Sequence, residues 1–301
     1  MSFRSERILA LSDVNHGNYA TTLSKEERRS VFLEILYNGM HGLCFSIYED
    51  GQKPGDVITY EQVKRRVGLL RPYTGWLRSF SCIEGNEHVP RAAKELGMQT
   101  LVGAWLGKDK EDNDKEIQAL IALCKEGLVD IAAVGNEVLY RGDLTEDELL
   151  DYIRYVKQEV KDIPVGYVDA YYEFGKRPQI TALCDIVLAN CYPFWEGCPI
   201  EDSLVYLKKM YNEALAAAGG KQVLITETGW PSKGEPLKGA KPSEENALNY
   251  FINAQQWASD ADINMFYFAS FDESWKVGDE GEVGAYWGIW DKNEQLKFVN
   301  H

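Results

Sequence analysis

The sequence predicts an α/β protein built as a single (β/α)8 (TIM) barrel. Eight short runs rich in β-branched and aromatic residues recur along the chain, and amphipathic stretches with helical spacing lie between them. Most of these runs are continuously apolar rather than alternating, which is typical of parallel strands covered on both faces. The runs span residues 42–48, 76–82, 100–106, 130–138, 164–170, 185–194, 222–230 and 264–271.

Helical patterns separate several of these runs. Apolar residues recur at i, i+3, i+4 and i+7 over residues 117–124, which predicts one buried helix face. A second helix is expected to begin at Thr145, because Thr145 and Glu148 have the spacing of a capping box. Residues 204–215 and 247–258 repeat the helical period before the last two strands.

A competing architecture is an open, doubly wound sheet. Such a sheet usually carries a glycine-rich phosphate-binding turn after an early strand, and none is visible here. No Pro/Ser-rich linker divides the chain, so we expect one domain over residues 1–301, with the barrel over 42–295. Residues 1–40 form an N-terminal extension with a helical pattern that ends at Gly39. This helix is expected either to plug the bottom of the barrel or to pack outside it.

The charge balance limits the possible partners. The chain has 47 Asp and Glu against 32 Lys and Arg, a formal net charge of −15. Nucleic acids and anionic membranes both require a basic surface, so neither is an expected partner. The same charge disfavours polyanionic substrates, and a neutral substrate fits best. We expect a monomer, because no long exposed apolar stripe is evident.

Cysteine and histidine usage gives no sign of a metal site or a disulfide framework. The 6 cysteines include no CxxC pair, and there are only 4 histidines. We therefore expect reduced, structural cysteines and no metal or organic cofactor. The first 18 residues lack the apolar core of a signal peptide. The chain as written is expected to be cytoplasmic, or periplasmic or secreted if a targeting segment has been removed.

Two glutamates end apolar runs at the places where a barrel carries its chemistry. Active-site residues of such barrels lie at the carboxyl ends of the strands. The fourth run ends in Asn136 and Glu137, and the seventh places Glu227 at its carboxyl end. Strands four and seven lie on opposite sides of an eight-stranded ring, so these two carboxylates face each other across the mouth.

Such a pair can cleave a glycosidic bond. One carboxyl must be protonated to donate to the leaving oxygen, and the other must be ionised to attack the anomeric carbon. Enzymes that retain configuration hold the pair about 5–5.5 Å apart, and inverting enzymes hold it farther apart. A single glutamate could instead be a salt-bridge or capping residue, but the paired placement favours catalysis.

Five motifs around these residues resemble glycoside hydrolase family 17, the β-1,3-glucanase family within a clan of (β/α)8 retaining glycosidases. They follow the family's order along the chain. The motifs are VGNEV (134–138), NCYPFW (190–195), TETGWPS (226–232), FDESWK (271–276) and YWGIWD (286–291).

The resemblance implies roles for individual residues. Glu137 resembles the general acid/base, and Glu227 resembles the nucleophile. Asn136 corresponds to the residue that binds the sugar 2-hydroxyl, and Tyr192 to the tyrosine that contacts the nucleophile. Glu282 is offset from the position of a further family glutamate and is assigned no role.

The resemblance also suggests substrate-binding residues. Glu273 and Lys276 match a charged pair that binds sugar hydroxyls, and Arg78 lies where the clan often places an arginine near the nucleophile. Six aromatic residues follow strand ends, where each could stack on a sugar or belong to the core. We expect two or three stacking platforms among Phe194, Trp195, Trp230, Trp275 and Trp287, and Tyr48 at the end of the first strand is a similar candidate.

The function expected from these observations is retaining, endo-acting hydrolysis of a neutral β-1,3-glucan of the laminarin type, by two glutamates and without a cofactor. A β-1,3-glucan transglycosylase with the same carboxylates is the near alternative. A glucan-binding barrel without activity is less favoured, because both glutamates are present. A barrel isomerase or aldolase would require a ligand cluster, a Schiff-base lysine or a phosphate site, and none is found.

Overall fold

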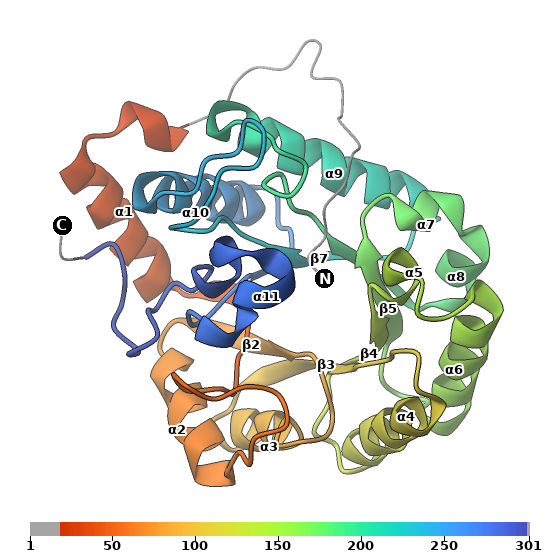
Figure 1. The fold of residues 1–301 in the computed structure, drawn as a ribbon. Helices are drawn as coiled ribbons and strands as arrows, with labels where there is room; N and C mark the ends of the chain where they lie inside the picture. Colours follow the sequence, from red (N-terminus) through yellow and green to blue (C-terminus); the bar gives the residue numbers. More distant parts are fainter. Residues whose placement is uncertain (1–18, 300–301) are drawn as a thin grey trace.

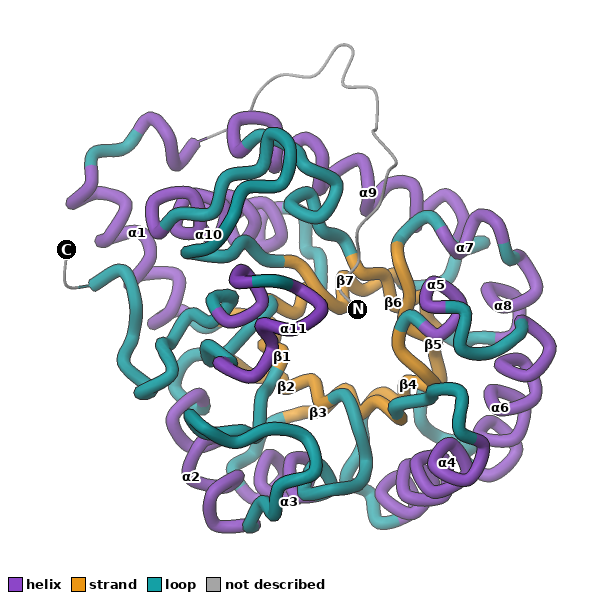
Figure 2. Tube along the Cα trace, in the orientation of Figure 1, coloured by secondary structure: helices purple, strands orange, loops and turns teal. Residues whose placement is uncertain are grey.

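The computed structural model describes residues 19–299 and shows a closed barrel of eight parallel strands (Figures 1 and 2). The strands follow one another around the ring in chain order, and β1 pairs with β8 to close it. Each predicted run overlaps one strand, so the predicted fold class is confirmed. The strands are β1 (Met40–Cys44), β2 (Thr74–Ser79), β3 (Gln99–Ala104), β4 (Ile131–Asn136), β5 (Val165–Ala170), β6 (Ile186–Asn190), β7 (Val223–Thr228) and β8 (Met265–Tyr267).

Helices surround the ring, as Figure 2 shows. Two short ones, α5 and α11, lie instead in the loops that follow β4 and β8, near the opening of the barrel. The α-helices are α1 (Lys25–Asn38), α2 (Tyr60–Leu70), α3 (His88–Glu95), α4 (Lys110–Lys125), α5 (Val138–Arg141), α6 (Glu146–Glu159), α7 (Glu173–Lys176), α8 (Pro178–Leu183), α9 (Ser203–Ala217), α10 (Glu244–Asp260) and α11 (Val277–Glu280). Short 3-10 helices are η1 (Tyr19–Thr22), η2 (Ile200–Asp202), η3 (Ser274–Lys276) and η4 (Glu282–Ala285).

Burial explains the continuous apolar runs. Every residue of β4, β5, β6 and β7 is buried, because side chains point either into the barrel or against the surrounding helices. The six cysteines are free and buried, as expected for structural thiols. Thr145 caps α6 through the predicted capping box with Glu148. No helix within residues 19–299 has the length and apolar character needed to cross a membrane.

The N-terminal helix packs outside the barrel and does not plug it. Figure 1 shows α1 beside α10. The ring of Phe32 is fully buried and lies 5.2 Å from the ring of Phe251 and 5.5 Å from that of Phe298. Arg28 adds an ion pair of 2.8 Å with Glu245 at the edge of this contact. Residues 1–18 of the predicted extension lie outside the described residues.

The docking of α1 can be tested by removing its central ring. We expect Phe32→Ala to lower the free energy of unfolding by about 3–5 kcal/mol, because the deletion leaves a cavity between α1 and α10. Arg29→Ala, at an exposed position of the same helix, should change it by less than about 0.5 kcal/mol. Urea unfolding followed by circular dichroism measures both. Equal stability of the two variants would contradict the packing described here.

Candidate active site

A cleft of about 720 Å³ opens at the carboxyl ends of the strands. Its lining comes from the ends of β1, β2, β3, β4, β6, β7 and β8 and from the loops that follow them. Asn136, Glu137 and Glu227 all contribute to this lining. The two glutamates therefore reach the same cleft from opposite sides of the ring, which is the arrangement that the strand positions predict.

Glu227 is buried and held by three donors. Arg78 Nη1 donates to its Oε1 at 2.6 Å, and Tyr192 Oη donates to its Oε2 at 2.8 Å. Asn190 Nδ2 donates to Oε1 at 3.0 Å. A buried carboxylate is costly unless a cation and hydrogen bonds compensate it, and here both are present. The site thus stabilises an ionised carboxylate at the end of β7.

Glu137 sits at a strained turn between β4 and α5. Its φ of 53° lies in the left-handed region, which residues other than glycine rarely adopt. The turn is fixed on both sides, because Glu137 N donates to Val168 O at 2.8 Å and Arg141 N donates to Glu137 O at 2.8 Å. Gly135 just before it has a φ of 85°, and a Cβ there would lie 2.6 Å from Val138 Cγ2. This backbone aims the Glu137 side chain into the cleft.

The electrostatic surroundings of Glu137 favour its protonated form. Burial raises the pKa of this carboxyl to about 8, and the negative charges of Glu227 and Asp169 add to the effect. Its single side-chain hydrogen bond within residues 19–299 comes from Asn190 Nδ2, at 2.8 Å. A carboxyl that keeps its proton near neutral pH can act as a general acid.

Asn190 lies between the two carboxylates and was missed by the sequence analysis. Its Nδ2 is 2.8 Å from Glu137 Oε1 and 3.0 Å from Glu227 Oε1, so these oxygens can be no farther apart than the sum, about 5.8 Å. Thr226 Oγ1 donates to Asn190 Oδ1 at 2.8 Å, which leaves the amide nitrogen to face both carboxylates. Asn190 ends β6, so the strand-end rule that identified the glutamates could have found it.

Arg78 connects the two halves of the site. Its Nη1 pairs with Glu227, and its Nη2 donates to Asn136 Oδ1 at 2.7 Å. The guanidinium lies over the ring of Phe80, 4.2 Å from the centroid. Arg78 is only 2% exposed and is not among the residues that line the cleft. It therefore supports the lining residues Glu227 and Asn136 rather than facing the cleft itself.

Glu273 and Lys276 form an ion pair in the lining of the cleft. Lys276 Nζ is 2.5 Å from Glu273 Oε2, and both side chains line the cleft. Glu280 lines it as well, and burial raises the pKa of this carboxyl to about 7. Glu282 instead pairs with Lys233 at 3.4 Å, outside the cleft lining. The segment after β8 therefore contributes two acidic residues to the cleft lining, Glu273 and Glu280, whereas Glu282 lies outside it.

The six aromatic candidates divide into two groups. Tyr48, Trp195 and Trp275 line the cleft. The expectation for the other three is corrected, because their rings pack on one another behind the cleft wall. The rings of Trp230 and Trp287 lie 5.3 and 5.5 Å from that of Phe194, and all three residues are at most 3% exposed. Tyr192 packs edge-on against Trp287. The buried cluster thus supports the side chain that holds Glu227.

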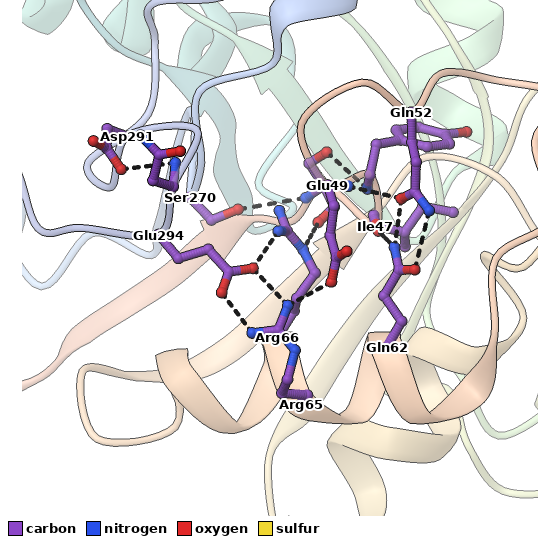
Figure 3. A network of polar contacts seen from close by, with 12 residues as sticks. Ile47, Glu49, Gln52, Gln62, Arg65, Arg66, Ser270, Asp291 and Glu294 are labelled. Carbon is purple, nitrogen blue, oxygen red and sulfur yellow. Dashed lines mark hydrogen bonds and ion pairs between the residues drawn. The ribbon is translucent and has the colours of Figure 1, made fainter.

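The loop that carries Tyr48 is tied to the C-terminal segment, as Figure 3 shows. Arg66 Nε donates to Ser46 O at 3.3 Å, and its Nη1 pairs with Glu294 Oε1 at 2.5 Å. Gln62 Nε2 donates to Ile47 O at 2.8 Å. These contacts hold the wall of the cleft that follows β1.

No group of three or more His, Cys, Asp or Glu residues that could hold a metal ion occurs within the described residues 19–299. The chemistry that these residues offer is proton transfer and nucleophilic attack by carboxylates.

The raised pKa of Glu137 can be tested through stability. A group whose pKa is raised in the folded state binds its proton more tightly there, so stability falls as the pH rises from about 4.5 to about 8. Glu137→Gln removes this loss. The variant should gain about 1–3 kcal/mol on the wild type between pH 5 and pH 8.

Glu61→Gln, at an exposed position of α2, is the matched control and should show no such trend. Chemical denaturation at pH 5, 6, 7 and 8 gives the comparison. A constant difference between Glu137→Gln and the wild type across this range would refute the raised pKa.

Comparisons with known proteins identify the family of this chain. The model of the family described as BtgE/BtgC glycoside hydrolase domain matches residues 42–288. A glucan 1,3-beta-glucosidase of Saccharomyces cerevisiae is 27% identical, over 93% of this chain and 97% of that protein. One from Arthroderma benhamiae is 31% identical, over 69% of this chain and 73% of that protein.

Solved structures extend the comparison. A glycoside hydrolase family 17 beta-1,3-glucanosyltransferase from Rhizomucor miehei is 30% identical, with a TM-score of 0.77 over 87% of this chain and 96% of that one. A beta-glucuronidase from Bacteroides uniformis, at 16% identity and a TM-score of 0.68, shares the fold alone. Because the family match covers residues 42–288, which include most of the barrel and both glutamates, the chain belongs to the BtgE/BtgC glycoside hydrolase domain family and is a glycoside hydrolase.

Proposed function

We propose that this chain is a retaining, endo-acting β-1,3-glucan hydrolase of glycoside hydrolase family 17, with Glu137 as acid/base and Glu227 as nucleophile. The observation that carries the proposal is the shared hydrogen bonding of both carboxylates to Asn190. It limits the separation of the bonded oxygens to about 5.8 Å, near the value for double displacement and below the 6.5–9.5 Å of inverting enzymes.

Several observations support the substrate class. The Saccharomyces cerevisiae and Arthroderma benhamiae relatives are named for 1,3-glucan, and the Rhizomucor miehei structure is described as family 17. The net charge of −15 suits a neutral polysaccharide. The cleft combines aromatic faces with carboxylate, amide and ammonium groups, as sugar recognition requires. We also propose that residues 1–301 form one catalytic domain, with the barrel over 42–295.

In the first step, Glu137 donates its proton to the glycosidic oxygen while Glu227 attacks the anomeric carbon. The bond to the leaving sugar breaks, and an ester between Glu227 and the glucosyl unit forms. Because Arg78 occupies Asn136 Oδ1, the amide nitrogen of Asn136 is left to donate to the sugar 2-hydroxyl. Glu273 and Lys276 bind further hydroxyls in the cleft.

In the second step, Glu137 takes a proton from a water molecule that attacks the anomeric carbon and releases Glu227. The structure offers a reason for the change of role. The charge of Glu227 is one of the causes that raise the pKa of Glu137, and this charge disappears once Glu227 is esterified. The pKa of Glu137 therefore falls in the intermediate, when a base is needed. The product keeps the β configuration.

Transfer is a second candidate, in which another glucan replaces water. It is favoured by the likeness to the Rhizomucor miehei beta-1,3-glucanosyltransferase, which covers 87% of this chain. Chromatography of the products from linear β-1,3-oligosaccharides distinguishes the two reactions. Products longer than the starting oligosaccharide indicate transfer, and only shorter ones indicate hydrolysis.

The two roles predict different behaviour of two alanine variants. Wild type should cleave β-1,3-glucan but not β-1,4-glucan, and Glu137→Ala should lose about 10²–10⁴-fold in rate. With an activated aryl β-glycoside and azide, Glu227→Ala should yield the α-glycosyl azide and Glu137→Ala the β-glycosyl azide. The difference arises because each azide ion enters on the side that the lost carboxylate occupied.

Glu282→Ala, which removes a glutamate outside the cleft, is the control and should behave as wild type. If the wild-type protein does not cleave β-1,3-glucan, the proposed substrate is wrong. Undiminished activity of Glu227→Ala, or the same azide product from both variants, would overturn the assigned roles.

A further inference from the structure

We propose that Trp105, which follows β3, is the aromatic platform of an additional sugar subsite in the cleft. The inference rests on the proposed glucan-degrading function and adds a binding position that the motifs did not indicate. Trp105 lines the cleft and is 43% exposed. By contrast, Trp195 in the same cleft is only 4% exposed. An indole that stays open to a cleft offers a large apolar face to the C–H face of a pyranose ring.

The backbone of Trp105 is fixed by a buried carboxylate. Trp105 N donates to Glu116 Oε2 at 3.2 Å, and Cys82 N donates to the same oxygen at 2.8 Å. The hydroxyl of Ser81 donates to Glu116 Oε1. Glu116 comes from α4 and is 3% exposed, and its carboxyl group joins the loops after β2 and β3. The platform therefore has a defined position before any ligand arrives.

The ring is fixed from one side by Arg141. The guanidinium carbon lies 4.5 Å from the centroid of the Trp105 ring, in a cation–π contact. Every guanidinium nitrogen already has an acceptor, because Arg141 bonds Asn136 O, Leu106 O and Asp143 Oδ2. One face of the indole is thus covered by a held cation, and its exposed area belongs to the other face and the edges.

Both contacts reduce the cost of binding. A side chain that is already ordered loses less conformational entropy when a ligand stacks on it. Because the nitrogens of Arg141 are engaged, the position suits an uncharged sugar rather than an anion. Arg141 also holds the carbonyl of Asn136, directly before Glu137. Arg141 therefore links the subsite to the turn that carries Glu137. This link fixes the distance between the Trp105 ring and the bond to be cleaved.

The test compares chain lengths. We would measure kcat/KM on β-1,3-oligosaccharides of two to seven glucose units for wild type, Trp105→Ala and Trp105→Phe. Trp105→Ala should lose about tenfold on oligosaccharides long enough to reach the platform and less than about twofold on the shortest one cleaved. Trp105→Phe should recover most of the loss, because it restores an aromatic face. Tyr37→Ala, which removes a 70% exposed ring on α1, should match wild type at every length.

The outcomes separate the possibilities. A loss confined to long substrates supports the subsite. An equal loss of kcat/KM at all substrate lengths would mean that Trp105 only supports Arg141 and the turn at Glu137. An unchanged kcat/KM at every length would mean that no sugar contacts the ring. Either result would overturn the inference. Failure of wild type to cleave any β-1,3-oligosaccharide would instead refute the proposed function.

Discussion

One side-chain amide organises the centre of this protein. Asn190 donates to Glu137 and to Glu227 at once, which requires the ends of β4, β6 and β7 to converge. In the closed ring of parallel strands, the carboxyl ends of all three strands lie at one opening. Within that frame the two carboxylates differ because Arg78 pairs with Glu227, whereas burial and neighbouring negative charge keep the proton on Glu137. Two residues of one type thereby have opposite electrostatic surroundings.

The surroundings of this centre come from distant parts of the chain. Arg78 in β2 reaches β7 and supports both strand ends, and the C-terminal segment reaches the β1 wall through Glu294. The aromatic cluster behind Tyr192 fills the space between the loops after β6, β7 and β8. The polar centre is therefore backed by tightly packed apolar side chains, which limits movement of the groups that must stay aligned.

Much of the fold was predictable, because strands buried on both faces leave continuous apolar runs in the sequence. The position of the glutamates followed from the same runs, since polar residues at their carboxyl ends must face the opening. The aromatic residues were harder to place. Trp195 and Trp230 both follow strand ends, yet one lines the cleft and the other packs in the core. That choice depends on the path of each loop, which local sequence does not determine. The sequence likewise left open whether α1 would plug the barrel or pack outside it. The strand-end position of Asn190 was visible in the sequence, but its bonds to both glutamates are seen only in the structure.

The central claim is that Glu227 attacks the sugar, while the hydrogen bonds of Asn190 hold the Glu227 carboxylate beside Glu137. The most direct measurement is mass spectrometry of the protein after reaction with a 2-deoxy-2-fluoro-β-laminaribiosyl fluoride, whose fluorine at C2 slows release of a covalent intermediate. The account predicts one added 2-deoxy-2-fluorolaminaribiosyl unit, with loss of the anomeric fluoride, located by peptide mapping on the peptide that contains Glu227. An adduct on another residue, or turnover with no adduct, would contradict it.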